Sequence, residues 1–155
     1  MKKLICIFAI VAVSSVLFFS CEELPCYNLD LVGTWTAPGG STTYTFTETN
    51  SFEKVTKSTS GVVVTTTPYP GTWETSGTNT LNFDFKDPSK SNESRLYEFV
   101  AGIDALTDLA ANSTDYTRTL GWAEDANYTA DDKILLFADP DDFSTSGWGD
   151  IFRLR

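Results

Sequence analysis

Large apolar residues alternate with threonine or polar residues in two short segments of this chain, STTYTFTE at residues 41–48 and TLNFDFK at residues 80–86. Alternation with a period of two is typical of a strand that buries one face. The pattern therefore predicts two half-buried strands. Their inward residues are Tyr44, Phe46, Leu81, Phe83 and Phe85, and their outward residues are Thr43, Thr45, Asn82 and Asp84.

A repeated tripeptide precedes each of these strands. GTW occurs at residues 33–35 and again at 71–73, and a turn containing glycine follows each copy, APGGS in the first case and TSGTN in the second. A strand, a glycine turn and a second, alternating strand predict a β-hairpin. The sequence thus indicates two similar hairpins. An internal duplication and shared turn chemistry both remain open as the origin of the repeat.

Further segments with the composition of strands follow at close spacing. SFEKVTK and GVVVTTTPY flank a predicted turn at STSG, and SRLYEFVAG, KILLFAD and DIFRLR come later in the chain. We expect inward positions for Tyr97, Phe99, Phe152 and Leu154, and an outward position for Arg153. Eight or nine short strands at this spacing are typical of an antiparallel barrel or sandwich.

Two segments depart from the strand pattern. In GIDALTDLAANS, apolar residues recur at intervals of three and four, and Asp104 is placed to cap the N-terminus, so a short helix is expected there. Residues 114–132 are polar and weakly periodic. A connection of this length is uncommon in a compact domain, so this segment is predicted to be either a functional loop or a further strand.

The first residues have the features of a targeting segment. A basic MKK start precedes an apolar run that is shorter than the roughly 20 residues needed to span a bilayer, and SCEELP ends that run. The junction LFFSC resembles the lipobox of bacterial lipoproteins, in which the cysteine is lipidated and becomes the new N-terminus. We therefore predict a signal peptide at residues 1–20, lipid attachment at Cys21 and a tether at residues 21–29. This would anchor the protein to the outer membrane of a bacterial envelope.

The alternative is an ordinary secreted protein that is cleaved near Ser20 and forms a disulfide between Cys21 and Cys26. The chain has three cysteines, and the remaining one, Cys6, lies in the predicted leader. If Cys21 carries lipid, Cys26 is left without a disulfide partner. Burial alone must then hold the domain together.

The charge balance argues against one class of partner. The chain carries 21 Asp and Glu but 11 Lys and Arg, a formal net charge of −10, and two of its lysines lie in the predicted leader. Binding to nucleic acid depends on basic side chains that neutralise phosphates. Because the sequence has no basic patch, no nucleic-acid partner is expected.

The sequence offers little for catalysis or metal binding. It contains no histidine, no Gly-x-Ser-x-Gly motif and no glycine-rich phosphate loop. DANYTADD sets oxygen-bearing side chains at alternate positions, but Ala130 stands where a calcium loop needs glycine. This segment and DPDDFSTSGWGD are interpreted as solvated acidic loops. The prediction is a protein that is not an enzyme and holds no cofactor and no metal.

LVGTWTAPGGSTTYTF resembles the first strand and turn of lipocalin-like proteins of the calycin group, whose signature is Gly-x-Trp, here Gly33 and Trp35. In that family an arginine on the last strand packs over the tryptophan, and Arg153 or Arg155 would be its counterpart. The resemblance implies an all-β fold over residues 30–155, an antiparallel up-and-down barrel of about eight strands with one short helix near the C-terminal third. Trp35 would close the floor of this barrel.

The resemblance implies that the protein binds a small apolar or amphipathic molecule outside the cytoplasm. The candidate contact residues are Tyr44, Phe46, Trp73, Phe83 and Tyr97. Two alternatives remain open, a structural or adhesive surface lipoprotein with a filled barrel and a protease inhibitor that acts through an exposed loop. A ligand cavity of about 300 Å³ or more would separate the first function from the other two. A protein partner and the oligomeric state are left open.

Overall fold

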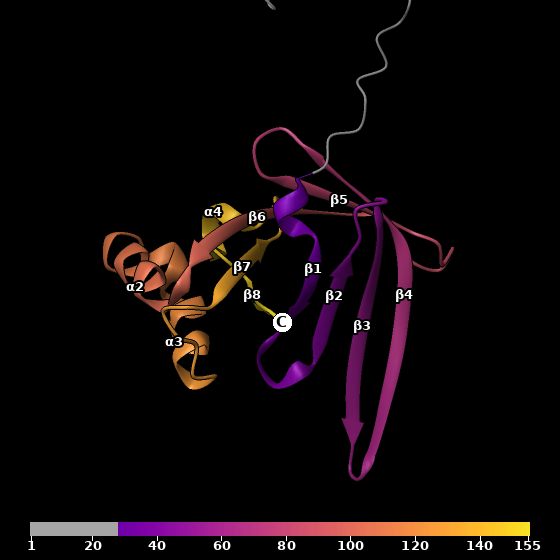
Figure 1. The fold of residues 1–155 in the computed structure, drawn as a ribbon, viewed down its shortest axis with the longest axis horizontal. Coiled ribbons are helices and arrows are strands. Elements are labelled where there is room, and N and C mark those ends of the chain that lie inside the picture. The colour runs from indigo at the N-terminus through magenta and orange to yellow at the C-terminus, as the bar shows by residue number, and fades with distance from the viewer. Residues whose placement is uncertain (1–27) are drawn as a thin grey trace, which may run out of the picture.

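The computed structural model describes residues 28–155, so the predictions for the leader, Cys21 and Cys26 lie outside the described residues. Eight antiparallel strands form a closed barrel in chain order, in which each strand pairs with the next and the last pairs with the first (Figure 1). This confirms the expected up-and-down barrel of eight strands.

The strands of the barrel range from 4 residues in β1 to 14 residues in β4. Its strands are β1 (Gly33–Thr36), β2 (Thr42–Phe46), β3 (Ser51–Ser60), β4 (Val63–Ser76), β5 (Thr80–Phe85), β6 (Glu93–Ala101), β7 (Lys133–Ala138) and β8 (Asp150–Leu154). The helical elements are η1 (Leu29–Leu31), η2 (Pro38–Gly40), α2 (Gly102–Asn112), η3 (Thr114–Tyr116), α3 (Thr117–Asp125) and α4 (Phe143–Ser146).

The two GTW copies begin equivalent hairpins. On β1, Trp35 lies opposite Tyr44 of β2, and on β4, Trp73 lies opposite Phe83 of β5. The glycines of both copies allow close approach. A Cβ on Gly33 would come within 2.7 Å of Leu154 Cδ1, and one on Gly71 would collide with the Asp84 carbonyl oxygen and the Phe52 ring. The repeat therefore marks two places where a neighbouring strand packs tightly beside an inward indole.

Aromatic side chains fill the interior of the barrel. Thirteen buried residues form one cluster, and ring centroids within it lie close together, 5.3 Å apart for Tyr44 and Phe152 and 4.9 Å for Phe52 and Phe83. The predicted inward residues all belong to this cluster or pack against it. The buried members are Tyr44, Phe46, Leu81, Phe83, Phe85, Tyr97 and Phe152, and Phe99 and Leu154 are partly buried. The predicted strand faces are confirmed, since Asp84 is exposed and Arg153 lies outside this core.

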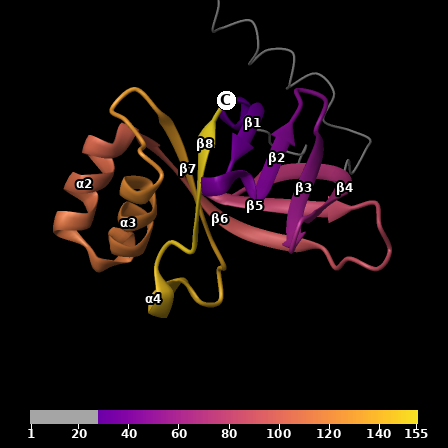
Figure 2. The same ribbon diagram turned by 90° about the horizontal axis from the view of Figure 1, so that it is seen from below.

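A second apolar cluster lies outside the barrel wall. Helices α2 and α3 cover the outer face of β6, β7 and β8 (Figure 2). Leu106 of α2 and Ala123 of α3 pack there with Ile134, Leu136 and Ile151 from the strands. Because β7 is buried on both faces after its exposed first residue, Lys133, the ILLFA sequence that follows is apolar throughout and does not alternate.

The prediction for residues 114–132 is wrong for most of the segment, because residues 114–125 are helical and only residues 126–132 form a loop. The helical part forms η3 and α3, so the chain has more than the one helix that was expected. The helical face was hard to recognise because one of its buried positions is a threonine. Thr119 is fully buried, and its hydroxyl donates a hydrogen bond of 2.9 Å to the Tyr116 carbonyl oxygen.

The predicted helix at residues 102–113 is present as α2, but Asp104 does not cap it. Asp104 lies within the first turn, and the N-cap residue Ala101 makes no side-chain cap hydrogen bond. The amide of Ile103 instead donates to the Thr129 carbonyl oxygen at 3.0 Å. The carbonyl group of Thr129 therefore accepts a hydrogen bond from the first turn of the helix, a contact that the local sequence does not reveal.

The hairpin of β3 and β4 is longer than predicted. STSG was expected to be the turn, but β3 continues through Ser60 and the chain reverses at Gly61 and Val62. The resulting ribbon projects beyond the barrel, away from the end where η1 lies (Figure 1). Val62 at its tip is 99% exposed.

Candidate functional site

The five predicted ligand contacts lie inside the packed barrel. Tyr44 and Phe83 have ring centroids 5.5 Å apart, and Phe46 and Trp73 are also 5.5 Å apart. Tyr97 lies farther along the barrel, where its ring contacts Phe99 and its hydroxyl accepts a hydrogen bond from Asn28 Nδ2 at 3.1 Å. The structure thus brings four of the five together, and their rings occupy the centre of the barrel.

Trp35 is held at one end of the barrel by the first helical turn. Its indole Nε1 donates a hydrogen bond of 2.7 Å to the Leu31 carbonyl oxygen, and η1 places the Leu31 side chain in the barrel core. The ring of Phe99 lies 5.8 Å away. Trp35 therefore closes this end of the aromatic core, as expected for a barrel floor.

The arginine that the resemblance places over Trp35 is elsewhere. Leu154 is the register partner of Trp35 on β8, so Arg153, one residue earlier, points to the outer side of the wall. There the Arg153 guanidinium lies 4.9 Å from the centre of the Tyr128 ring. Arg155 lines the same outer region. The correction follows from strand alternation, because neither arginine shares the face of Leu154.

An apolar pocket of about 420 Å³ opens beside Trp35. Strand ends of β1, β6, β7 and β8 and the turn η1 form its walls. Its main apolar residues are Leu29, Val32, Trp35, Phe99, Ile134 and Leu154, and Asp30 and Lys133 add one charge of each sign. Leu29 is 63% exposed, so the pocket has an uncovered apolar edge.

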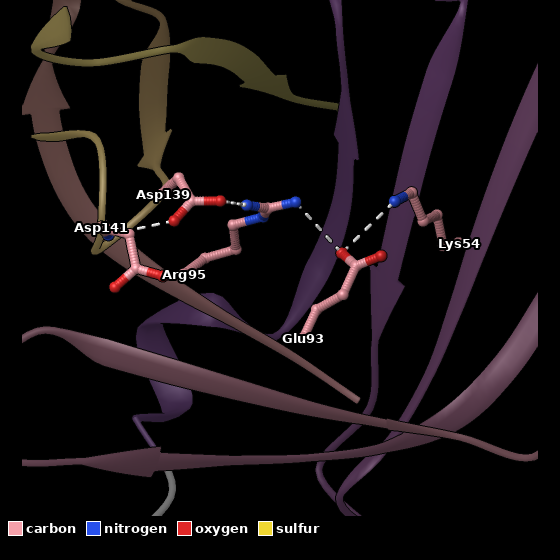
Figure 3. Close-up of polar contacts among 5 residues, drawn as sticks. All are labelled: Lys54, Glu93, Arg95, Asp139 and Asp141. Atoms are coloured by element: carbon pink, nitrogen blue, oxygen red, sulfur yellow. Dashed lines mark hydrogen bonds and ion pairs between the residues drawn. The ribbon is translucent and has the colours of Figure 1, made fainter. Parts of the chain in front are cut away.

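Partly exposed charged side chains lie at the barrel end near the first residues of β6, at the opposite end of that strand from the Trp35 pocket. Figure 3 shows Glu93 between two cations, with Lys54 Nζ at 3.6 Å and Arg95 Nη2 at 3.4 Å from its Oε2 atom. Arg95 Nη1 also pairs with Asp139 Oδ2 at 3.0 Å. Two positive and two negative side chains therefore form one compensated network.

This network lies directly against the aromatic core. Lys54 Nζ lies 5.5 Å from the centre of the Tyr44 ring and 5.9 Å from that of Phe85. Burial, with a smaller effect from the Glu93 carboxylate, raises the pKa of the Tyr44 hydroxyl far above its ordinary value. Tyr44 is therefore a neutral core residue over the whole physiological pH range.

The predicted strand faces do not include Lys54, Glu93 or Arg95, although the sequence carries a signal for their inward position. Lys54 follows the inward Phe52 by two residues, and Arg95 and Glu93 precede the inward Tyr97 by two and four. The same period of two therefore assigns all three charges to the interior. Because an inward charge is costly unless it is paired, an inward Lys, Glu and Arg at one barrel end predicts mutual pairing.

The pockets near the charged network are more polar than the one beside Trp35. One of about 410 Å³ includes Trp73 and Phe83 of the predicted contacts, and one of about 380 Å³ lies beside Arg95 and Asp139. Asn92, Glu93 and Ser94 line both. Tyr44, Phe46 and Tyr97 line neither of these pockets nor the one beside Trp35.

Comparisons of the chain with protein-family models, with curated proteins and with solved structures find no match. Within residues 28–155, no group of three or more Cys, Asp or Glu side chains is arranged to hold a metal ion. In the same part of the chain, no helix has the length and apolar character to cross a membrane. Inferences about function therefore rest on the geometry of the barrel and its pockets.

Proposed function

We propose that this protein is a lipid-anchored barrel of the bacterial envelope that binds a small apolar or amphipathic molecule in the pocket beside Trp35. The observation that carries the proposal is the pocket itself. Its volume of about 420 Å³ lies within the range of about 300–1,000 Å³ that is typical of small-molecule sites. Apolar side chains dominate its lining, as such a ligand requires.

The lining also favours an amphipathic ligand. Trp35, Phe99 and Leu154 offer an apolar wall, and Asp30 and Lys133 supply polar groups to orient a headgroup. Leu29 is exposed beside them in the free protein. Covering the Leu29 side chain would remove apolar area from water, which contributes about 25 cal/mol for each Å².

The centre of the barrel is a poor site for the same ligand. Tyr44, Phe46 and Phe83 already contact one another there and lie in one buried cluster. Making room for a ligand would mean displacing at least one aromatic ring, and loss of such packing costs about 3–5 kcal/mol. We therefore place the ligand at the end of the barrel.

A ligand-binding experiment tests the site with one exposed residue. We expect Leu29→Asp to weaken binding of the neutral amphipathic dye N-phenyl-1-naphthylamine at least tenfold, because a carboxylate then occupies the apolar edge of the pocket. Fluorescence titration measures the dissociation constant. Val62→Asp is the matched control, since it makes the same change of charge at the exposed tip of the hairpin.

The outcomes of this titration separate the functions considered. Weaker binding by Leu29→Asp with unchanged binding by Val62→Asp supports the pocket. Equal binding by Leu29→Asp and the unsubstituted protein would contradict it. Absence of any dye binding, together with no small molecule retained in native mass spectrometry, would favour the alternative of a structural or adhesive lipoprotein with a filled barrel.

The anchor is tested separately at Cys21. We expect Cys21→Ser to abolish labelling by fatty acid and to release the protein from the membrane fraction, because an acyl chain contributes about 0.8 kcal/mol of membrane affinity for each buried CH₂. Metabolic labelling and cell fractionation measure both effects. Cys26→Ser is the matched control and should stay anchored. Membrane association of the Cys21 variant equal to that of the control would refute the anchor.

A further inference from the structure

A polar pocket of about 300 Å³ lies on the outer wall of the barrel, apart from the Trp35 pocket. It is bordered by the turn η2, the middle of β3, the end of β8 and the segment that follows α3. Three cationic residues line it, Lys57, Arg153 and Arg155. Its other residues are Thr36, Ala37, Pro38, Gly39, Gly40, Ala126 and Tyr128.

The charge of this lining is opposite to that of the protein. The chain has 21 acidic and 11 basic side chains, yet the pocket includes three basic residues and no Asp or Glu. A recess lined by charges of one sign attracts ions of the other sign and raises their local concentration. In a chain with a formal net charge of −10, such a recess favours an anion locally over the rest of the surface.

We propose that this pocket binds a small organic anion that carries a phosphate or carboxylate group. The pocket has room for more than an inorganic phosphate. Its volume of about 300 Å³ is many times the roughly 30 Å³ that one water molecule takes up in the liquid. A ligand the size of a phosphate ester or a small polycarboxylate suits its volume. The site is independent of the proposed ligand beside Trp35, since the outward residues of β1 and β8 form this pocket and their inward neighbours form the other.

Arg153 is held in position for this role. Its guanidinium lies over the Tyr128 ring, and its Nη1 atom is 3.5 Å from Asp132 Oδ2. Asp132 is itself fixed, because it accepts hydrogen bonds from the Thr129 amide at 2.7 Å and from the Thr129 hydroxyl at 3.2 Å. An arginine has five N–H donors, so this single ion pair leaves donors for a carboxylate or phosphate.

Tyr128 supplies a second, independent indication of a ligand. The residue lines the pocket and is 6% exposed, and its hydroxyl is buried with no hydrogen-bond partner among the described residues. A buried polar group without a hydrogen-bond partner destabilises the fold. Burial raises the pKa of Tyr128 to about 12, so the hydroxyl keeps its proton as a donor at neutral pH. An anionic acceptor would provide the missing partner.

Two variants test the site without threatening the fold. Lys57→Gln removes an exposed charge, and Tyr128→Phe removes only the unpartnered hydroxyl while keeping the ring beneath Arg153. We expect glycerol 3-phosphate to bind the unsubstituted protein, and we expect each variant to raise its dissociation constant at least threefold. Tyr128→Phe should leave the melting temperature equal or higher, because it deletes an unsatisfied buried group.

The measurement is isothermal titration calorimetry at about 0.15 M salt, where exposed charges are screened beyond about 8 Å. Lys86→Gln is the matched control, since it removes an exposed lysine that is not part of the pocket. Inorganic phosphate, titrated in parallel, shows how much affinity comes from the anionic group alone. The control should change the dissociation constant less than 1.5-fold.

Three results would overturn the proposal. One is absence of binding by both anions at millimolar concentration. Another is an equal loss of affinity in Lys86→Gln and Lys57→Gln, which would indicate a diffuse charge effect. The third is unchanged affinity in both pocket variants. Amide shifts in NMR spectra at Gly39 and Gly40 on addition of glycerol 3-phosphate would support this location, and shifts confined to other residues would contradict it.

Discussion

Replacing Trp35 with alanine is expected to lower the free energy of unfolding by about 3–5 kcal/mol, and Trp73→Ala should have an effect of the same size. The two indoles are 1% and 2% exposed. Each one packs against a ring of the core, Trp35 against Phe99 at 5.8 Å and Trp73 against Phe46 at 5.5 Å. Truncation would leave a cavity in a close-packed aromatic cluster. Denaturant unfolding without any added ligand measures the loss.

Trp122→Ala is the control for these two variants. This indole lies on α3 and is 38% exposed, so its truncation should cost about 1 kcal/mol or less. From the sequence, Trp73 is a candidate ligand contact, and its truncation would be expected to cost less stability than that of Trp35. Similar losses for Trp35→Ala and Trp73→Ala would show that both GTW copies are structural. A much smaller loss for Trp73→Ala would contradict their equivalence.

Gly71→Ala is expected to destabilise the barrel by about 3 kcal/mol, near the upper end for overpacking a core position. A Cβ at this residue would collide with the backbone carbonyl oxygen of Asp84 and with the Phe52 ring. Asp84 of β5 is the register partner of Thr72, which follows Gly71 on β4. Relief of the clash would therefore require β4 and β5 to separate. Thermal and denaturant unfolding measure the change.

Gly121→Ala provides the opposite expectation for the same chemical change. Gly121 lies within α3, and a Cβ there would meet no atom within 4 Å. Because alanine is favoured over glycine by about 1 kcal/mol in a helix interior, this variant should be more stable than the original protein. If Gly71→Ala were as well tolerated as Gly121→Ala, the close approach of the two strands would not be a constraint on the fold.

The core strands of the barrel could be predicted from the sequence because they bury one face each. Tyr44, Phe46, Leu81, Phe83 and Phe85 follow a period of two, and that period alone assigns them to the interior. The same period assigns Arg153 to the outer face. It therefore contradicts the arginine position that the family resemblance implies, and the local pattern proved the better guide.

Helix α3 could not be predicted in this way, because its environment decides which of its residues are buried. Thr119 is fully buried, and its hydrogen bond to the Tyr116 carbonyl oxygen satisfies its hydroxyl there. A threonine in such a place weakens the hydrophobic period. The outer face of β6 to β8 determines the burial of α3, and this face is assembled from three strands that are separate in the chain.

The candidate sites also depend partly on local strand periodicity and partly on tertiary packing. Alternation determines by itself that Glu93, Arg95 and Lys54 face inward, and charge then requires them to pair.

Whether space for a ligand remains depends on how completely the rings fill the barrel and on where the strand ends leave gaps. The pockets beside Trp35 and Tyr128 join residues from β1, β8 and other distant segments. The sequence alone determined the alternating strand faces, because strand periodicity is local, and the pairing of β1 with β8 then closed these strands into a barrel. Only the tertiary structure decided the pockets, because a pocket is a property of packing between segments that the local pattern does not relate.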